Sequence, residues 1–355
     1  MAVWKGEELR ESDLQDVAEL GRTIWGRKWR RSCDPSYYKW KYFGGYRPTS
    51  SGVILRENGR LIAMLGTCSR PFRFGHESAW ALEFCDAMTH PEYRGKNIFS
   101  DLAHPLLEQM TQADFLPIYA IWTREATRLL ERKFGMESLF DIWRLILPLT
   151  PEAAFTSSIP AWTARLGFGP VTKFREMGRN LWEKHEEKID VRREGVIGSW
   201  VDELWSNAQT RLEAGVSKDK DYLRWRYCEG PDTFRIYRAV KSNETVGLLV
   251  TKVRARTEDR AIGFIADILV PSYDRAIIKK LLMEAELDFK SDKVIWVEAW
   301  STLHRFYLPA LASFGFWPVS RIPIRLPADQ VTQIRQQGWS SRLHWTLNMG
   351  DSDYI

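Results

Sequence analysis

The residues between positions 86 and 99 combine a strand end, a tight turn and positive charge in a way that could bind an anion. Their sequence is Asp-Ala-Met-Thr-His-Pro-Glu-Tyr-Arg-Gly-Lys-Asn-Ile-Phe. Pro91 cannot continue a central strand, so the strand must end close to it. Gly95 permits an unusual backbone angle, and Arg94 and Lys96 place positive charge on either side of it. The turn therefore favours binding of a pyrophosphate.

The residues that follow this turn have the spacing of an amphipathic helix. Apolar side chains recur at Ile98, Leu102, Leu106 and Met110. The first turn of a helix offers N–H groups that have no helical partner, together with the positive end of the helix dipole, and both favour an anion. Arg-Gly-Lys alone is also a common surface turn, so the flanking elements must distinguish an anion site from a solvent-exposed loop.

Length, composition and charge bound the class of protein. The 355 residues are enough for two domains, and 44% apolar with 27% charged residues is ordinary for a globular protein. The net charge of +5 is modest and spread out, which fits an anionic ligand and argues against DNA as a partner. No apolar segment resembles a signal peptide or approaches a membrane span.

The cysteines give no sign of a metal site. Cys33, Cys68, Cys85 and Cys228 form no CxxC pair and no cluster with histidine at metal-ligand spacing. We therefore expect reduced thiols, no bound metal and a cytoplasmic protein.

The first 150 residues are predicted to form an α/β domain that positions the turn. Asn58-Gly59 between two apolar runs is a strong hairpin signal. In order, the predicted elements are a helix over 12–24, strands over 53–56 and 61–67, a long strand over 77–89, the helix over 98–110, a strand over 117–122, a helix over 125–134 that ends at Gly135, and a last strand over 139–147.

The second half of the chain repeats the first. Residues 32–42 align with residues 217–227 at a constant offset of 185, and Ser, Asp, Tyr, Trp and Tyr are identical. A predicted hairpin follows each copy, and the next strand ends in an acid, Asp86 or Asp267. Each copy then continues with a helix, a strand and a second helix. Two copies of one α/β unit account for the length of the chain.

The copies differ at the turn itself. Residues 270–278, Val-Pro-Ser-Tyr-Asp-Arg-Ala-Ile-Ile, contain no glycine, and Asp274 stands where an anion would have to approach. We expect the second copy to keep the fold without the cofactor site. The predicted division is a domain over 1–150, a linker and helical segment over 151–190, and a domain over 191–355. The acidic tail over 345–353 is predicted to be a solvated terminus.

The stretch His-Pro-Glu-Tyr-Arg-Gly-Lys-Asn-Ile-Phe resembles the acyl-CoA-binding motif of the GNAT acyltransferases. Arg94 matches the first motif position, whereas Asn97 and Phe99 stand where the family usually has small residues. The resemblance implies an α/β (α+β) fold of two tandem GNAT-like domains, each a mixed, mostly antiparallel sheet flanked by helices. It also implies that the turn holds the pyrophosphate of acetyl-CoA or another acyl-CoA, through Arg94, Gly95, Lys96, Asn97, Ile98 and Phe99.

The same resemblance implies a mechanism in which an acceptor amine attacks the thioester directly. Backbone N–H groups of Met88 and Thr89 would hold the pantetheine and the thioester oxygen. Glu83 is the first choice for the base and Asp86 the second. In a regular strand only one of them could face the acceptor, and a bulge, which the family commonly has in this strand, would change that register. The family's tyrosine acid has no counterpart over residues 127–134, which leaves Tyr93, Tyr119 or solvent.

Tandem copies of this kind resemble bacterial acetyltransferases associated with polysaccharide biosynthesis. The implied partner is a small-molecule amine acceptor, an amino sugar or a sugar nucleotide, with acyl chain length and oligomeric state open. Two alternatives remain. One is a Fem-type transferase that uses aminoacyl-tRNA. The other is a non-catalytic binding protein, which Asn97, Phe99 and the missing tyrosine support, and for which Phe99 would be expected to fill the pyrophosphate site.

Overall fold

A computed structural model describes residues 4–26, 33–44, 51–112, 116–121, 130–155, 189–257, 260–302 and 306–353. Its residues form two compact units. The first unit comprises Met1–Phe140, Glu229–Asp232 and Pro323–Ser340, and the second comprises Asp141–Cys228, Thr233–Ile322 and Ser341–Ile355. Within the described residues, no helix is both long enough and apolar enough to cross a bilayer.

The sheet of the first unit is antiparallel except where β4 meets β5. The hairpin predicted at Asn58-Gly59 is confirmed, because both residues have positive φ angles, 52° and 79°. The strands are β1 (Glu7–Glu8), β2 (Ser51–Glu57), β3 (Arg60–Phe74), β4 (Glu77–Thr89) and β5 (Ile118–Ala120), joined by the end of β13 (Trp317–Pro327).

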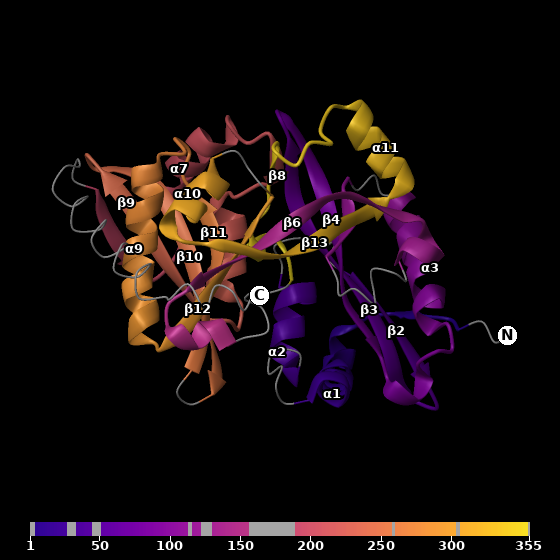
Figure 1. The fold of residues 1–355 in the computed structure, drawn as a ribbon. Helices are drawn as coiled ribbons and strands as arrows, with labels where there is room; N and C mark the ends of the chain where they lie inside the picture. The colour runs from indigo at the N-terminus through magenta and orange to yellow at the C-terminus, as the bar shows by residue number, and fades with distance from the viewer. Residues whose placement is uncertain are drawn as a thin grey trace. The chain divides into compact units, whose positions relative to one another are not determined.

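Helices cover both faces of this sheet (Figure 1). One apolar core lies under α3 (Ile98–Gln112), and a second lies under α1 (Leu14–Trp25) and α2 (Pro35–Tyr38). A π-helical turn, Lys39–Phe43, follows α2. Residues 130–134 are helical and end at Gly135, whose φ of 59° confirms the predicted glycine stop. The remaining helical segments are α11 (Ala328–Gln336) and the 3-10 turns Glu11–Asp13 and Pro91–Tyr93.

The second unit repeats this order of elements, which confirms the predicted duplication. Strands β9 to β12 pair antiparallel except for β11 and β12, which are parallel, as β4 and β5 are in the first unit. Helices α9 and α10 cover one face of these strands. The strands are β6 (Met136–Pro148), β7 (Asp190–Glu194), β8 (Ala214–Val216), β9 (Phe234–Lys241), β10 (Glu244–Thr257), β11 (Arg260–Leu269), β12 (Val294–Ser301) and β14 (Trp345–Thr346). The helical segments are α7 (Trp200–Gln209), α8 (Lys220–Arg224), α9 (Arg275–Ser291), α10 (Tyr307–Phe314), a π-helical turn Trp225–Glu229, and 3-10 turns Pro151–Phe155 and Met349–Asp351.

Two strands pass from one unit to the other. β6 begins in the first unit, and its residues Trp143–Pro148 pair with β12 of the second. β13 begins in the second unit, and its Arg325 pairs with Ala120 of β5. The strand predicted over 139–147 therefore exists, but it pairs within the second unit. The sequence boundaries near residues 150 and 190 stay a prediction.

Candidate functional site

The candidate site lies where β4 continues beyond its parallel neighbour. β4 and β5 pair from Leu82 with Ile118 to Phe84 with Ala120, where β5 ends. β4 runs on to Thr89 and leads directly into the basic turn. The predicted contact residues Met88 and Thr89 are on this extension, so their place in the strand suits groups that would approach a ligand between β4 and β5.

The predicted bulge is present in this extension. Cys85 lies opposite Gly66 and Met88 lies opposite Met64, so Asp86 and Ala87 together face the single residue between them on β3. Asp86 has a φ of 46°, in the left-handed region that residues other than glycine rarely adopt. The strand therefore changes its side-chain register at Asp86.

The basic turn has the backbone that its sequence predicts. Gly95 and Asn97 have φ angles of 79° and 63°, so asparagine takes the left-handed conformation where the motif usually has glycine. The Asn97 carbonyl accepts hydrogen bonds from the amides of Ser100 (3.0 Å) and Asp101 (3.2 Å), which starts α3. Arg94, Gly95, Lys96 and Asn97 are exposed, so the turn is accessible at the N-terminus of the helix.

Phe99 packs away from the turn. It lies against the apolar core beneath α3, with its ring edge-on to Phe134 at 5.6 Å between centroids, and Ile98 beside it is buried. On the other side, the Lys96 ammonium lies 4.4 Å from the centre of the Tyr93 ring. The Tyr93 hydroxyl donates to the Glu57 carboxylate, which raises the pKa of Tyr93.

Glu83 forms a buried ion pair on the sheet face opposite α3. Its Oε2 is 2.7 Å from Nη2 of Arg70 on β3, and each side chain is only 2% exposed. The neighbours Leu82 and Phe84 belong to the core beneath α3, so alternation along the strand turns Glu83 to the other face.

The side chain of Asp86, which is 7% exposed, lies on that same face. Its Oδ2 accepts from Lys41 Nζ and from the Tyr42 hydroxyl, both at 2.6 Å. Burial and the negative charge of Asp86 raise the pKa of Tyr42 well above its usual value, which keeps this hydroxyl protonated as a donor. Because of the bulge, both predicted bases lie on one face, and each is held by a cation.

The structure places the other acid candidates less favourably. Tyr119 is buried in β5, and the hydroxyl of Tyr93 is engaged by Glu57. Thr123 and Glu125 stand near positions where the GNAT acyltransferases that the turn resembles often have asparagine, and both lie outside the described residues. The described residues of the following helix, 130–134, contain no tyrosine.

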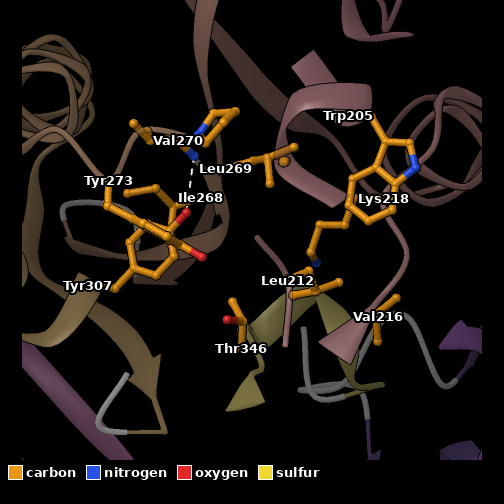
Figure 2. Close-up of a pocket in the computed structure, with 12 residues that line it drawn as sticks. Trp205, Leu212, Val216, Lys218, Ile268, Leu269, Val270, Tyr273, Tyr307 and Thr346 are labelled. Carbon is orange, nitrogen blue, oxygen red and sulfur yellow. Dashed lines mark hydrogen bonds between the residues drawn. The ribbon is translucent and has the colours of Figure 1, made fainter. Parts of the chain in front are cut away.

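The counterpart of the turn in the second unit borders a pocket that is lined in part by the aromatic side chains of Trp205, Tyr273 and Tyr307 (Figure 2). The Val270 amide donates to the Tyr307 hydroxyl at 3.0 Å, and the Tyr273 ring stacks on Phe306 at 4.5 Å. Asp274 caps α9 by accepting from the amide of Ala276 at 2.8 Å. That the second copy lacks a cofactor site stays a prediction.

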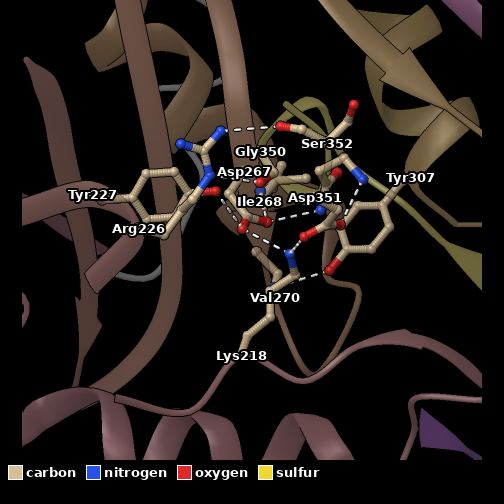
Figure 3. A network of polar contacts seen from close by, with 11 residues as sticks. Lys218, Arg226, Tyr227, Asp267, Ile268, Val270, Tyr307, Gly350, Asp351 and Ser352 are labelled. Carbon is tan, nitrogen blue, oxygen red and sulfur yellow. Dashed lines mark hydrogen bonds and ion pairs between the residues drawn. The ribbon is translucent and has the colours of Figure 1, made fainter. Parts of the chain in front are cut away.

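The predicted solvated tail is wrong, because the tail is buried in the second unit (Figure 3). The side chain of Asp351 is 1% exposed and pairs with Lys218, whose Nζ is also 2.7 Å from Oδ2 of Asp267. Arg226 donates to the carbonyls of Gly350 (2.9 Å) and Ser352 (3.1 Å). The two copies differ at this position, with Cys33 in the first and Lys218 in the second, and this difference is the sequence feature that marks an acidic partner in the second unit.

The buried carboxylate of Asp351 makes stability depend on pH. Burial raises its pKa to about 6, and the charge of Asp267 adds to the rise while Lys218 opposes it. An unfolded aspartate has a pKa of about 3.9, so the folded protein holds this proton more tightly and loses stability as the pH rises through that interval. Asp351→Asn is therefore expected to gain stability relative to wild type between about pH 4 and pH 7. Urea unfolding at several pH values measures the difference.

The control for this prediction is Asp202→Asn. Asp202 is exposed and lies 3.6 Å from Lys220, so its removal should produce a small difference at every pH. A difference between Asp351→Asn and wild type that stays flat with pH would contradict the prediction.

Comparisons with known proteins agree with this geometry. Residues 7–137 match a family described as an acetyltransferase (GNAT) domain. No curated protein matches the chain significantly. Among solved structures, N-myristoyltransferase of Saccharomyces cerevisiae with bound myristoyl-CoA is similar at a TM-score of 0.60 and 12% identity, covering 92% of this chain and 83% of that one.

Two further structures are similar over nearly the whole chain. A GCN5-related N-acetyltransferase from Anabaena variabilis has a TM-score of 0.58 and 13% identity, covering 91% of this chain and 72% of that one. A tandem GNAT protein from the clavulanic acid biosynthesis pathway has a TM-score of 0.57 and 14% identity, covering 90% and 98%. The chain therefore has the predicted tandem GNAT fold, with the matched acetyltransferase domain in its first half.

Proposed function

We propose that the protein is an N-acyltransferase that moves an acetyl group, or another acyl group, from acyl-CoA to an amine. The observation that carries the proposal is the continuous path of β4 into the turn. The strand outruns β5, bulges at Asp86, and ends in a basic turn with two left-handed residues at the start of α3. A helix N-terminus with adjacent cations is suited to a pyrophosphate.

The proposed reaction uses the two ends of this path. The turn residues Arg94–Phe99 bind the pyrophosphate, and the amides of Met88 and Thr89 hold the pantetheine and polarise the thioester carbonyl. The acceptor nitrogen loses a proton to a carboxylate, attacks the carbonyl carbon, and the CoA thiolate leaves. Glu83 is the proposed base, with Asp86 as the alternative.

The acceptor is proposed to be an amino sugar or a sugar nucleotide of polysaccharide biosynthesis, met in the cytoplasm. The support is the resemblance of the tandem sequence. The acyl group is proposed to be acetyl, although one similar structure contains myristoyl-CoA. Turnover of acetyl-CoA against amino sugars, amino acids and polyamines tests the acceptor class, and parallel titrations with acetyl-CoA and myristoyl-CoA test the chain length.

The packing of Phe99 favours this proposal over a non-catalytic protein. A pyrophosphate site filled by Phe99 would favour that alternative, and Phe99 instead lies against the apolar core with Phe134. The Fem-type alternative does not require the basic turn, which this chain retains. Calorimetry with acetyl-CoA and myristoyl-CoA is the direct test, and binding of neither at sub-millimolar concentration would overturn the proposed function.

Removing both cations of the turn is expected to weaken acyl-CoA binding without unfolding the protein. A hydrogen bond to a charged group contributes about 1.5–3 kcal/mol, so the double variant Arg94→Ala, Lys96→Ala should bind about 10- to 100-fold more weakly. Both side chains are exposed, so stability should change little. Calorimetry measures the affinity, and circular dichroism measures the fold.

The matched control is Arg275→Ala. Arg275 is the exposed cation at the start of α9, the equivalent helix of the second unit. It should leave acyl-CoA affinity unchanged. Equal affinities for the double variant and this control would show that the turn is not the cofactor site.

A further inference from the structure

The two units contain the same buried contact between a tyrosine and an aspartate. In the first, the Tyr42 hydroxyl donates to Oδ2 of Asp86 at 2.6 Å, and in the second the Tyr227 hydroxyl donates to Oδ2 of Asp267 at 2.9 Å. The two tyrosines occupy the same position of the sequence repeat. Each aspartate lies just beyond the point where the parallel strand pairing ends, at Phe84 or at Phe264.

A lysine neutralises each aspartate, but from a different position of the repeat. Lys41 lies 2.6 Å from Asp86, whereas its counterpart is Arg226, which binds backbone carbonyls. In the second unit the amine comes from Lys218, whose counterpart is Cys33. A buried carboxylate without a cation is strongly destabilising, so this compensation is needed wherever the aspartate is kept.

The second unit keeps this network without the features of a cofactor site. Its turn lacks glycine, and the amide of Val270 already donates a hydrogen bond to the Tyr307 hydroxyl. The ion pair of Arg70 and Glu83 is not repeated at the equivalent position of the second unit. Glu83 is three positions before Asp86, whereas the residue three positions before Asp267 is Phe264. The second unit therefore serves as an internal control that separates a requirement of the fold from a requirement of the chemistry.

We propose that Lys41, Tyr42 and Asp86 are positioning residues that fix the bulge of β4, and that Asp86 is not the proton acceptor. The proposal rests on the proposed function for its catalytic consequence. Asp86 adopts the left-handed φ of 46° at which the strand register shifts. Its carboxylate accepts hydrogen bonds from the buried side chains of Lys41 and Tyr42. The bulge in turn sets where the amides of Met88 and Thr89 lie.

Gly66 is part of this arrangement. It lies opposite Cys85 on β3, directly beneath the Tyr42 hydroxyl. A Cβ at this position would be 1.8 Å from that oxygen, so only glycine allows the tyrosine to reach Asp86. Gly350 has the same relation to Tyr227 in the second unit, with a Cβ distance of 1.9 Å.

The experiment compares Tyr42→Phe with Tyr227→Phe, which remove the equivalent hydrogen bond from the two units. Hydrogen–deuterium exchange is expected to accelerate over residues 85–89 in Tyr42→Phe and to stay at the wild-type rate there in Tyr227→Phe. The KM for acyl-CoA should rise roughly 2- to 10-fold in Tyr42→Phe only, the size of one lost hydrogen bond, with a smaller change in kcat. Unchanged exchange over residues 85–89 in Tyr42→Phe would overturn the proposal, whether or not the protein binds acyl-CoA.

A second pair of variants tests the role of the Asp86 charge. Asp86→Asn removes the carboxylate charge that pairs with the Lys41 ammonium, and Lys41→Met in the same chain removes the matching positive charge while the amide oxygen still accepts from Tyr42. For a positioning residue, the double variant should recover kcat over Asp86→Asn alone. For a base, both should remain about 10²- to 10⁴-fold below wild type at every pH, which would overturn the proposal. Failure of wild type to bind acyl-CoA would instead refute the proposed function, and the exchange result would still decide the positioning role.

Discussion

Replacing Lys218 with methionine is expected to lower the free energy of unfolding by about 3–5 kcal/mol. Lys218 is 2% exposed and is ion-paired with both Asp267 and Asp351, whose side chains are at most 1% exposed. Coulombic attraction from the two aspartates raises the pKa of Lys218 despite its burial, so it stays charged at neutral pH. Without it, two carboxylates remain buried with no amine between them. Urea unfolding followed by tryptophan fluorescence measures the loss.

Two further variants show whether the loss comes from charge. Adding Asp351→Asn to Lys218→Met removes one of the uncompensated carboxylates and should restore part of the stability. Lys220→Met removes an exposed lysine two residues away, 3.6 Å from Asp202, and should change stability by less than about 1 kcal/mol. Equal stability of Lys218→Met and Lys220→Met would contradict the expectation.

The parts of the fold that follow from local backbone chemistry could be predicted from the sequence. Asn58-Gly59 fixes a hairpin, and Pro91 ends the strand before it. Gly95 and Asn97 supply the left-handed angles of the turn. Each of these residues restricts its own backbone, so its effect does not depend on distant partners.

Pairing between distant segments could not be predicted in the same way. An apolar run such as β6 identifies a strand, but it does not say which neighbour will accept its hydrogen bonds, and β6 pairs with β12 about 150 residues later. The burial of the acidic tail could not be predicted for a related reason. Asp351 is buried because Lys218 meets it, and the two lie 133 positions apart in the sequence.

The candidate site shows both situations. The backbone of the turn could be predicted from its own residues, whereas the ion pairs of Glu83 and Asp86 could not. The donors Arg70 and Lys41 come from a neighbouring strand and from the π-helical turn, and no spacing rule connects them with β4. The bulge places both acids on one face, which a regular strand would not do.

Glu83→Gln is expected to reduce kcat by about 10²- to 10⁴-fold, the usual contribution of a general base. Glutamine keeps the size of the side chain and an oxygen that can accept from Arg70, but it cannot take a proton. Acyl-CoA affinity should stay close to wild type, because the proposed cofactor contacts come from Met88, Thr89 and the turn. Steady-state kinetics measures kcat, and calorimetry measures the acyl-CoA affinity.

Glu298→Gln is the matched control, because it alters the same kind of pair in the second unit. Glu298 on β12 accepts from Arg144 at 2.6 and 2.9 Å, and its side chain is 4% exposed. Both variants remove the charge of a buried glutamate that is paired with an arginine, so both should lower stability. Only Glu83→Gln should lose kcat, because the proposed cofactor turn is in the first unit. Equal losses of kcat in the two variants would assign Glu83 a structural role, and full activity of Glu83→Gln would exclude it as the base.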